Sequence, residues 1–104
     1  MGVRLILKNE VLTAVLSGEI DHHSAREIRS EIDSTATKVK PKKLALDFSA
    51  VSFMDSSGIG LVMGRYKAMQ AVGGEVYVEN TTAHIKKVMK LAGLDRIALI
   101  DGLK

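Results

Sequence analysis

A short polar motif, Asp55-Ser56-Ser57-Gly58, is the part of the sequence best suited to chemistry. It follows the apolar stretch Ala50–Met54 and precedes a long apolar run, so it lies where a strand should end and a helix begin. A carboxylate or hydroxyl there accepts hydrogen bonds from free N–H groups of the first helical turn. The same helix end, with its positive dipole, tolerates an added phosphate. The motif therefore predicts a helix cap and offers a serine for phosphorylation, and the two roles are compatible.

Other chemistry fits this motif less well. A hydrolase nucleophile elbow reads Gly-x-Ser-x-Gly, but Met54 stands at the first glycine position before Ser56. The spacing of Gly58, Gly60 and Gly64 matches neither a dinucleotide fingerprint nor a P-loop. Close packing of the helix or close approach of a partner explains these glycines better. A small-ligand or nucleotide sensor, with a ligand phosphate held at the 58–60 turn, stays open as an alternative.

A second polar motif, Asp21-His22-His23, precedes another helical pattern. Adjacent histidines on a helix point about 100° apart, so they make a poor chelating pair. Asp21 and Ser24 are both candidate N-caps, and Ser24 with Glu27 matches a capping box. We therefore predict capping with exposed or partner-facing histidines, and no metal or other cofactor.

The bulk composition limits the class of protein. The 104 residues, of which 46% are hydrophobic and 26% charged, predict one domain spanning residues 1–104. The sequence has no cysteine, which excludes disulfides and thiolate metal sites. No apolar run approaches the ~20 residues that a membrane span needs, and no signal peptide is apparent, so we expect a cytoplasmic protein. The net charge of +3 and the few aromatic residues argue against nucleic-acid binding.

Hydrophobic periodicity predicts strands alternating with helices after an initial hairpin. The fold class is therefore α/β, a single domain of order β-β-α-β-α-β-α-β, with a mostly parallel mixed sheet and helix cover. The expected strands are Arg4–Lys8, Val11–Ser17, Lys43–Phe48, Glu75–Glu79 and Arg96–Ile100, with 18–21 breaking the second strand and Ala50–Met54 irregular. The expected helices are His22–Thr37, Ser57–Val72, and one capped by Thr81 or Thr82 and ended by Gly93.

The helical patterns also predict which side chains are buried. In the second helix, Arg65, Lys67 and Gln70 should mark the solvent side. In the third helix, the residues expected to point inward are Ile85, Val88, Met89 and Ala92. Its lysines, Lys86, Lys87 and Lys90, are expected to form a solvated face.

Taken together, these motifs resemble the STAS domain of the anti-sigma factor antagonist type. The resemblance spans nearly the whole sequence and is carried by Gly18–His23, Phe53–Gly60 and Gly64–Lys67. It is strongest toward the sporulation branch of the family. Members often continue into a further helix after the last strand. The given sequence ends at Lys104, so we expect that this helix is either absent or outside the given sequence.

The resemblance implies a regulatory binding protein rather than an enzyme. Such antagonists bind an anti-sigma factor that is itself a serine kinase, in its ADP-bound state, and thereby release the sigma factor (sigma F in sporulation). With ATP bound, the kinase phosphorylates and inactivates the antagonist, and a serine phosphatase restores it. The position that matches the phosphoacceptor is Ser56, with Ser57 starting the helix. The positions expected to face the kinase are Asp21, His22, Asp55, Ser57, Gly58, Ile59, Gly60 and Leu61.

Overall fold

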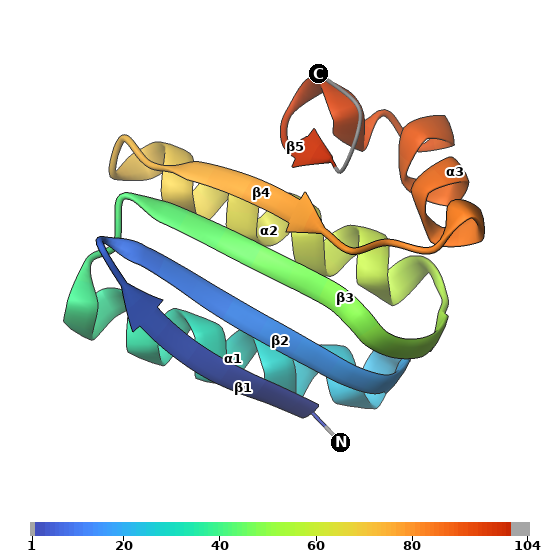
Figure 1. Ribbon diagram of the computed structural model, residues 1–104, viewed down its shortest axis with the longest axis horizontal. Helices are drawn as coiled ribbons and strands as arrows, with labels where there is room; N and C mark the ends of the chain where they lie inside the picture. The colour runs from blue at the N-terminus through green and yellow to red at the C-terminus, as the bar shows by residue number, and fades with distance from the viewer. Residues whose placement is uncertain (1, 101–104) are drawn as a thin grey trace.

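The computed structural model describes residues 2–100 as a sheet with two long helices on one face (Figure 1). The elements follow the predicted order, which confirms the α/β fold class. Their bounds are β1 Gly2–Lys8, β2 Val11–Ile20, α1 His22–Val39, β3 Lys43–Met54, α2 Ser56–Ala71, β4 Glu75–Glu79, α3 Ala83–Leu91, a 3-10 turn η1 Leu94–Arg96, and β5 Leu99–Ile100.

The sheet is mixed and its strands keep their chain order, β1-β2-β3-β4-β5. The β1–β2 hairpin is antiparallel, and each later strand pairs parallel with the one before it. The hairpin turn places Asn9 and Glu10 at positive φ, as a tight two-residue connection requires. Each parallel crossover brings the chain back across the sheet, and α1 and α2 make two of these crossovers behind the strands (Figure 1).

The core lies between the sheet and these helices. Residues of β2 alternate between buried and half-buried, so Leu12, Ala14 and Leu16 all enter the core. The strands contribute Phe48 and Val78 among others, and α1 contributes Ile28 and Ile32 at helical spacing; all are at most 1% exposed. The packing fixes α1 and α2 against the same face of the sheet and against each other.

The middle strands run further than their sequence predicts. β2 continues to Ile20 and β3 continues through the stretch expected to be irregular, because the two strands pair with each other to the end. Register shifts after Val15 and Gly18 let the pairing absorb unmatched residues. The break at 18–20 and the irregular stretch Ala50–Met54 were therefore predicted wrongly, since the pairing that makes them strands is not visible in either segment alone. The strand does end before Asp21, which is the N-cap of α1 as predicted.

The C-terminal part also departs from expectation. Thr82 rather than Thr81 caps α3, and Gly93 follows the helix at positive φ as predicted. Ile85 and Met89 are buried, whereas Val88 is half-buried and Ala92 exposed. The expected last strand, Arg96–Ile100, is wrong: the chain makes η1 first, and only Leu99–Ile100 pairs with β4. Among the described residues, no helix is long and apolar enough to cross a membrane.

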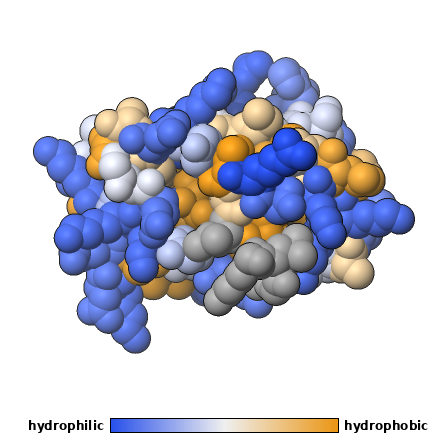
Figure 2. All heavy atoms as spheres, turned by 90° about the horizontal axis from the view of Figure 1, so that it is seen from above, coloured by the Kyte–Doolittle hydropathy of each residue, from blue (hydrophilic) through white to orange (hydrophobic). Residues whose placement is uncertain are grey.

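Large apolar side chains are not all buried. Figure 2, seen from above, shows hydrophobic atoms at the surface between hydrophilic side chains. The exposed large apolar residues are Ile6, Leu7, Val39, Phe53, Met63, Val72 and Leu91. Two of these exposed residues, Phe53 and Met63, lie close in sequence to the Asp55–Gly58 motif, one on each side of it.

Candidate functional site

Two helix N-termini lie side by side at the carboxyl edge of the sheet. The last paired residues of β2 and β3 are Ile20 and Met54, and the Asp55 N–H donates to the Ile20 carbonyl at 3.1 Å. Each strand is followed at once by an aspartate, Asp21 or Asp55, in the same extended conformation. The two polar motifs of the sequence therefore meet at one place, where α/β sheets commonly form their binding sites.

Both aspartates are N-caps. The Asp21 carboxylate accepts from the backbone N–H groups of His23 and Ser24, both at 3.0 Å. Ser24 completes the capping box, because its hydroxyl accepts from the Asp21 N–H at 2.9 Å and donates to the Glu19 carbonyl at 2.7 Å. The box predicted from Ser24 and Glu27 is therefore wrong in register, since Ser24 is the third residue of the helix and not its cap.

Asp55 has the same role for α2. Its carboxylate accepts from the Ser57 N–H at 2.7 Å, so α2 begins at Ser56 and not at Ser57. Ser56 is exposed, and within residues 2–100 no side chain hydrogen-bonds to its hydroxyl. Capping is thus done by the aspartate, which leaves the serine free at the positive end of the helix.

An exposed stripe runs along α2 from this serine. Ser56, Gly60 and Met63 are spaced at i, i+4 and i+7, and all three are exposed. Phe53, 53% exposed, lies just before the motif, and Met63 is 40% exposed. Met63 belongs to the long apolar run after the motif, so its exposure departs from what the sequence predicts. The clue was available at Met63, which shares the spacing of Ser56 and Gly60.

The other proposed contact residues divide by burial. His22 and Asp55 are exposed, whereas the half-buried residues are Asp21, Ser57 and Ile59. Gly58 and Leu61 are buried and offer a partner little surface. A Cβ at Gly58 would collide with the Met54 side chain, so close packing is confirmed at this glycine. It is wrong for Gly60 and Gly64, because a Cβ built at either one meets nothing within 4 Å.

Substitution of the two glycines should have opposite effects on stability. An added Cβ at Gly60 meets open space, so Gly60→Ala should stabilise the fold by up to ~1 kcal/mol through helix propensity. Gly58→Ala should destabilise it by about 1–3 kcal/mol, because Met54 must move. Urea unfolding of both variants measures the difference. Equal effects of the two substitutions would contradict this packing.

The Asp21 cap should make stability depend on pH. Hydrogen bonds from Ser24 and His23, led by the Ser24 N–H, hold the pKa of Asp21 below its ordinary value of 3.8. A lowered pKa in the folded state stabilises the fold above the ordinary value, and this contribution disappears as pH falls through the folded pKa. The stability gap between the parent and Asp21→Asn, whose amide can still cap, should therefore shrink from pH 7 to strongly acidic pH. Urea midpoints across this range test it, and a gap independent of pH would show that ionised Asp21 contributes nothing.

The polar side chains of the site make local contacts. The carboxylates of Asp21 and Asp55 accept hydrogen bonds from backbone N–H groups. His22 and His23 stack edge to face with ring centroids 5.9 Å apart. No group of histidine and acidic residues within the described part of the chain is arranged to hold a metal ion.

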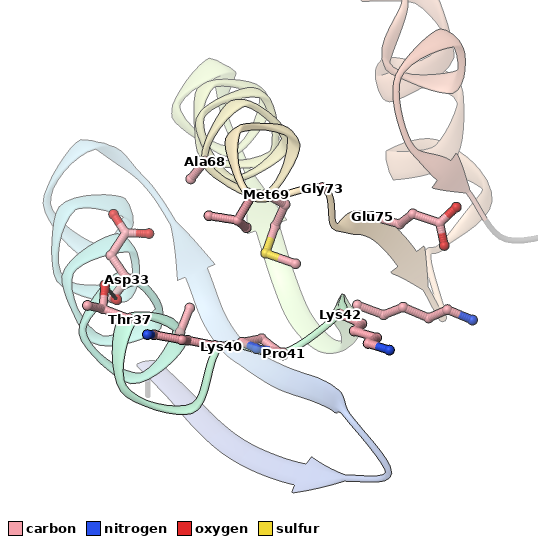
Figure 3. Close-up of a pocket in the computed structure, with 12 residues that line it drawn as sticks. Asp33, Thr37, Lys40, Pro41, Lys42, Ala68, Met69, Gly73 and Glu75 are labelled. Atoms are coloured by element: carbon pink, nitrogen blue, oxygen red, sulfur yellow. Dashed lines mark hydrogen bonds between the residues drawn. The ribbon is translucent and has the colours of Figure 1, made fainter.

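Between α1 and α2 the surface has two hollows, one at each end. The smaller, of about 320 Å³, opens beside the motif and is lined by His22, Ala25, Arg26, Arg29, Ser57, Gly60 and Leu61. The larger, of about 1070 Å³, lies at the opposite ends of the helices. There the Met69 side chain extends from α2 into the hollow, and Lys40 and Pro41 follow α1 (Figure 3).

Between the hollows, one charged residue is buried where sequence reasoning expected solvent. Arg65 is 6% exposed, in contrast to the exposed Lys67 and Gln70. Its Nε lies 2.9 Å from Oδ1 of Asp33 on α1, an ion pair. Burial lowers the pKa of Arg65, the Asp33 charge opposes this, and Arg29 adds to it. The prediction failed because α2 is covered on two sides, by the sheet and by α1.

Comparison with known proteins places the chain in a family. The sequence model of the STAS domain matches residues 4–102. An anti-sigma F factor antagonist of Paenibacillus polymyxa is 34% identical over 87 residues, 84% of this chain and 74% of that protein. An anti-sigma-B factor antagonist of Bacillus subtilis is 30% identical over 79% of this chain and 73% of its own length.

Solved structures of anti-sigma factor antagonists have the same fold as this chain. The anti-sigma factor antagonist SpoIIAA in its unphosphorylated form matches with a TM-score of 0.77 and 29% identity, over 99% of this chain and 90% of its own. The phosphorylated form of the Bacillus cell fate determinant SpoIIAA matches with a TM-score of 0.75 and 32% identity, over 96% and 91%. The chain therefore belongs to the STAS domain family, as its motifs indicated.

Proposed function

We propose that this chain is an anti-sigma factor antagonist, switched by phosphorylation of Ser56. The observation that carries the proposal is the free, exposed Ser56 hydroxyl at the N-terminus of α2, beside the capped start of α1. The names of its relatives, antagonists of anti-sigma F and anti-sigma-B factors, support the class of partner. Residues 1–104 would act as one domain.

In this proposal the unphosphorylated chain binds an ADP-bound anti-sigma factor that is a serine kinase, and sigma factor is released. The contact surface would be formed by Asp21, His22, Asp55, Ser57, Ile59 and Gly60, extended by Phe53 and Met63. Exposed apolar side chains beside a polar, open helix end suit an interface with a small apolar centre. Gly60 lets another backbone approach α2 closely, because no side chain projects there.

Phosphorylation would break this interface without refolding the chain. A phosphate adds about −1.5 to −2 charges and considerable bulk at the centre of the proposed surface. The helix end accommodates the phosphate locally, so exclusion of the partner and not a conformational change would do the switching. A serine phosphatase would reset it.

The test is displacement of sigma factor. The cognate anti-sigma factor is assembled with its sigma factor and ADP, and the purified chain is added. We expect free sigma factor to appear on gel filtration in proportion to added chain. Retention of the whole complex, with a correctly folded chain, would contradict the proposal.

A second candidate function, small-ligand sensing, is favoured by the large hollow at the far ends of α1 and α2 (Figure 3). It lies away from the Gly58–Gly60 turn where sequence reasoning placed a ligand phosphate. A thermal-shift screen with nucleotides tests it, because a ligand that binds the folded state raises the melting temperature.

A further inference from the structure

The small hollow beside the motif has an unusual charge. On α1, His22, Arg26 and Arg29 lie at i, i+4 and i+7 and form one stripe facing α2. No carboxylate lines this basic groove, although the described chain has acidic residues on α1 itself. Glu27 and Glu31 fall on other sides of the helix at their spacing. Asp33 continues the stripe beyond Arg29 but lies outside the groove, so the ionisable side chains that line the groove are all basic.

A further basic residue, the buried Arg65, lies next to the groove on α2. Arg65 follows Leu61 by one turn on α2, and Arg29 is close enough to lower the pKa of Arg65. Asp33 on α1 is the counter-ion of Arg65, with which it forms an ion pair. The buried NH1 of Arg65 has no hydrogen-bond partner within residues 2–100. Arg65 therefore has a carboxylate partner, whereas within residues 2–100 neither Arg26 nor Arg29 forms an ion pair.

The shape of the groove suits a side chain from outside. The Arg26 side chain lies beside His22, with its NH2 3.5 Å from Nε2 of that ring, and Ser57 lines the groove from α2. Gly60 forms the opposite wall with no side chain, and a Cβ built there meets nothing within 4 Å. An arginine pair at an open helix end binds carboxylates well, because guanidinium groups match their geometry.

We infer that the basic groove receives an acidic segment of the protein partner, seated between α1 and α2 on Arg26 and Arg29. The inference rests on the proposed function and specifies the chemistry of that partner's contact. The groove begins one residue from Ser56, so a phosphate on Ser56 would neutralise the arginines that the acidic segment needs. Phosphorylation would then remove an attraction as well as add repulsion.

The experiment measures binding of the ADP-loaded cognate anti-sigma factor by calorimetry. Arg26→Glu and Arg29→Glu are compared with Lys38→Glu, which makes the same charge change on the same helix, exposed and outside the groove. We expect the groove variants to bind at least about 10-fold more weakly and the control within about 3-fold of the parent, since local pairing exceeds long-range steering. Binding of the parent should also weaken more between about 0.05 and about 0.5 M salt than that of Arg26→Glu.

Three outcomes are distinguishable once circular dichroism shows each variant folded. If Arg26→Glu and Arg29→Glu bind the anti-sigma factor more weakly while Lys38→Glu does not, the inference is supported. Groove variants that bind like Lys38→Glu overturn it, while the proposed function stands because the parent binds. A parent that does not bind contradicts the proposed function, and the inference falls with it.

Discussion

Ser56→Asp should bind the ADP-loaded anti-sigma factor at least about 30-fold more weakly than the parent, whereas Ser56→Ala should bind almost as tightly. A charge placed in the centre of an interface costs about 2–5 kcal/mol when the binding partner offers it no counter-charge, and Asp55 lies next to the new carboxylate. Alanine removes only a hydroxyl that makes no hydrogen bond to the described residues. Calorimetric titration of both variants against the parent measures the two effects.

The matched control for this pair is Ser34→Asp. It adds the same charge at an exposed serine in the second half of α1, outside the basic groove. It should bind within about 3-fold of the parent, as expected for a charge away from the interface. If Ser56→Asp bound as tightly as Ser34→Asp, the helix end would not be the contact surface and the electrostatic account of the switch would be wrong.

A large effect on stability is expected from the Asp33–Arg65 pair. Asp33→Asn should destabilise the fold by about 2 kcal/mol, because the buried guanidinium loses its counter-ion. Breaking a fully buried pair costs about 3–5 kcal/mol, but the Asp33 side chain is 44% exposed and water compensates in part. Urea unfolding at neutral pH measures the loss.

Arg65→Met separates the ion pair from simple packing. Replacing the buried cation with an apolar chain of similar length removes the need for a counter-ion, so this variant should lie within about 1 kcal/mol of the parent. In the Arg65→Met background, the further substitution Asp33→Asn should then change the free energy of unfolding very little. If Asp33→Asn were equally harmful with and without Arg65, the carboxylate would stabilise α1 by some other contact.

The capped helix starts were predictable from sequence because capping is local. Asp21 and Asp55 each stand between an apolar strand and a helical pattern, and the hydrogen bonds they accept come from residues two or three positions later. The α/β order was predictable for the same reason, since each element carries its own period. The spacing of the residues does not say which serine accepts a phosphate. The prediction of Ser56 rather than Ser57 came from the family resemblance.

What could not be predicted depends on neighbours far away in sequence. The strand through Ala50–Met54 exists because β2 pairs with it, and the burial of Arg65 exists because α1 covers α2. Met63 is the reverse case, because it is exposed although it belongs to the long apolar run that follows the motif. The basic groove combines residues from α1 and α2, so neither helix reveals it alone.

The most direct test of the switch is the mass of the intact protein after incubation with its cognate anti-sigma kinase and ATP, with Ser56→Ala alongside. The account predicts one added phosphate on the parent, mapped to Ser56 by fragmentation, and none on the variant. It also predicts that the phosphorylated parent no longer binds the ADP-loaded kinase. An active kinase that leaves the parent unmodified, or that modifies both proteins equally, would contradict it.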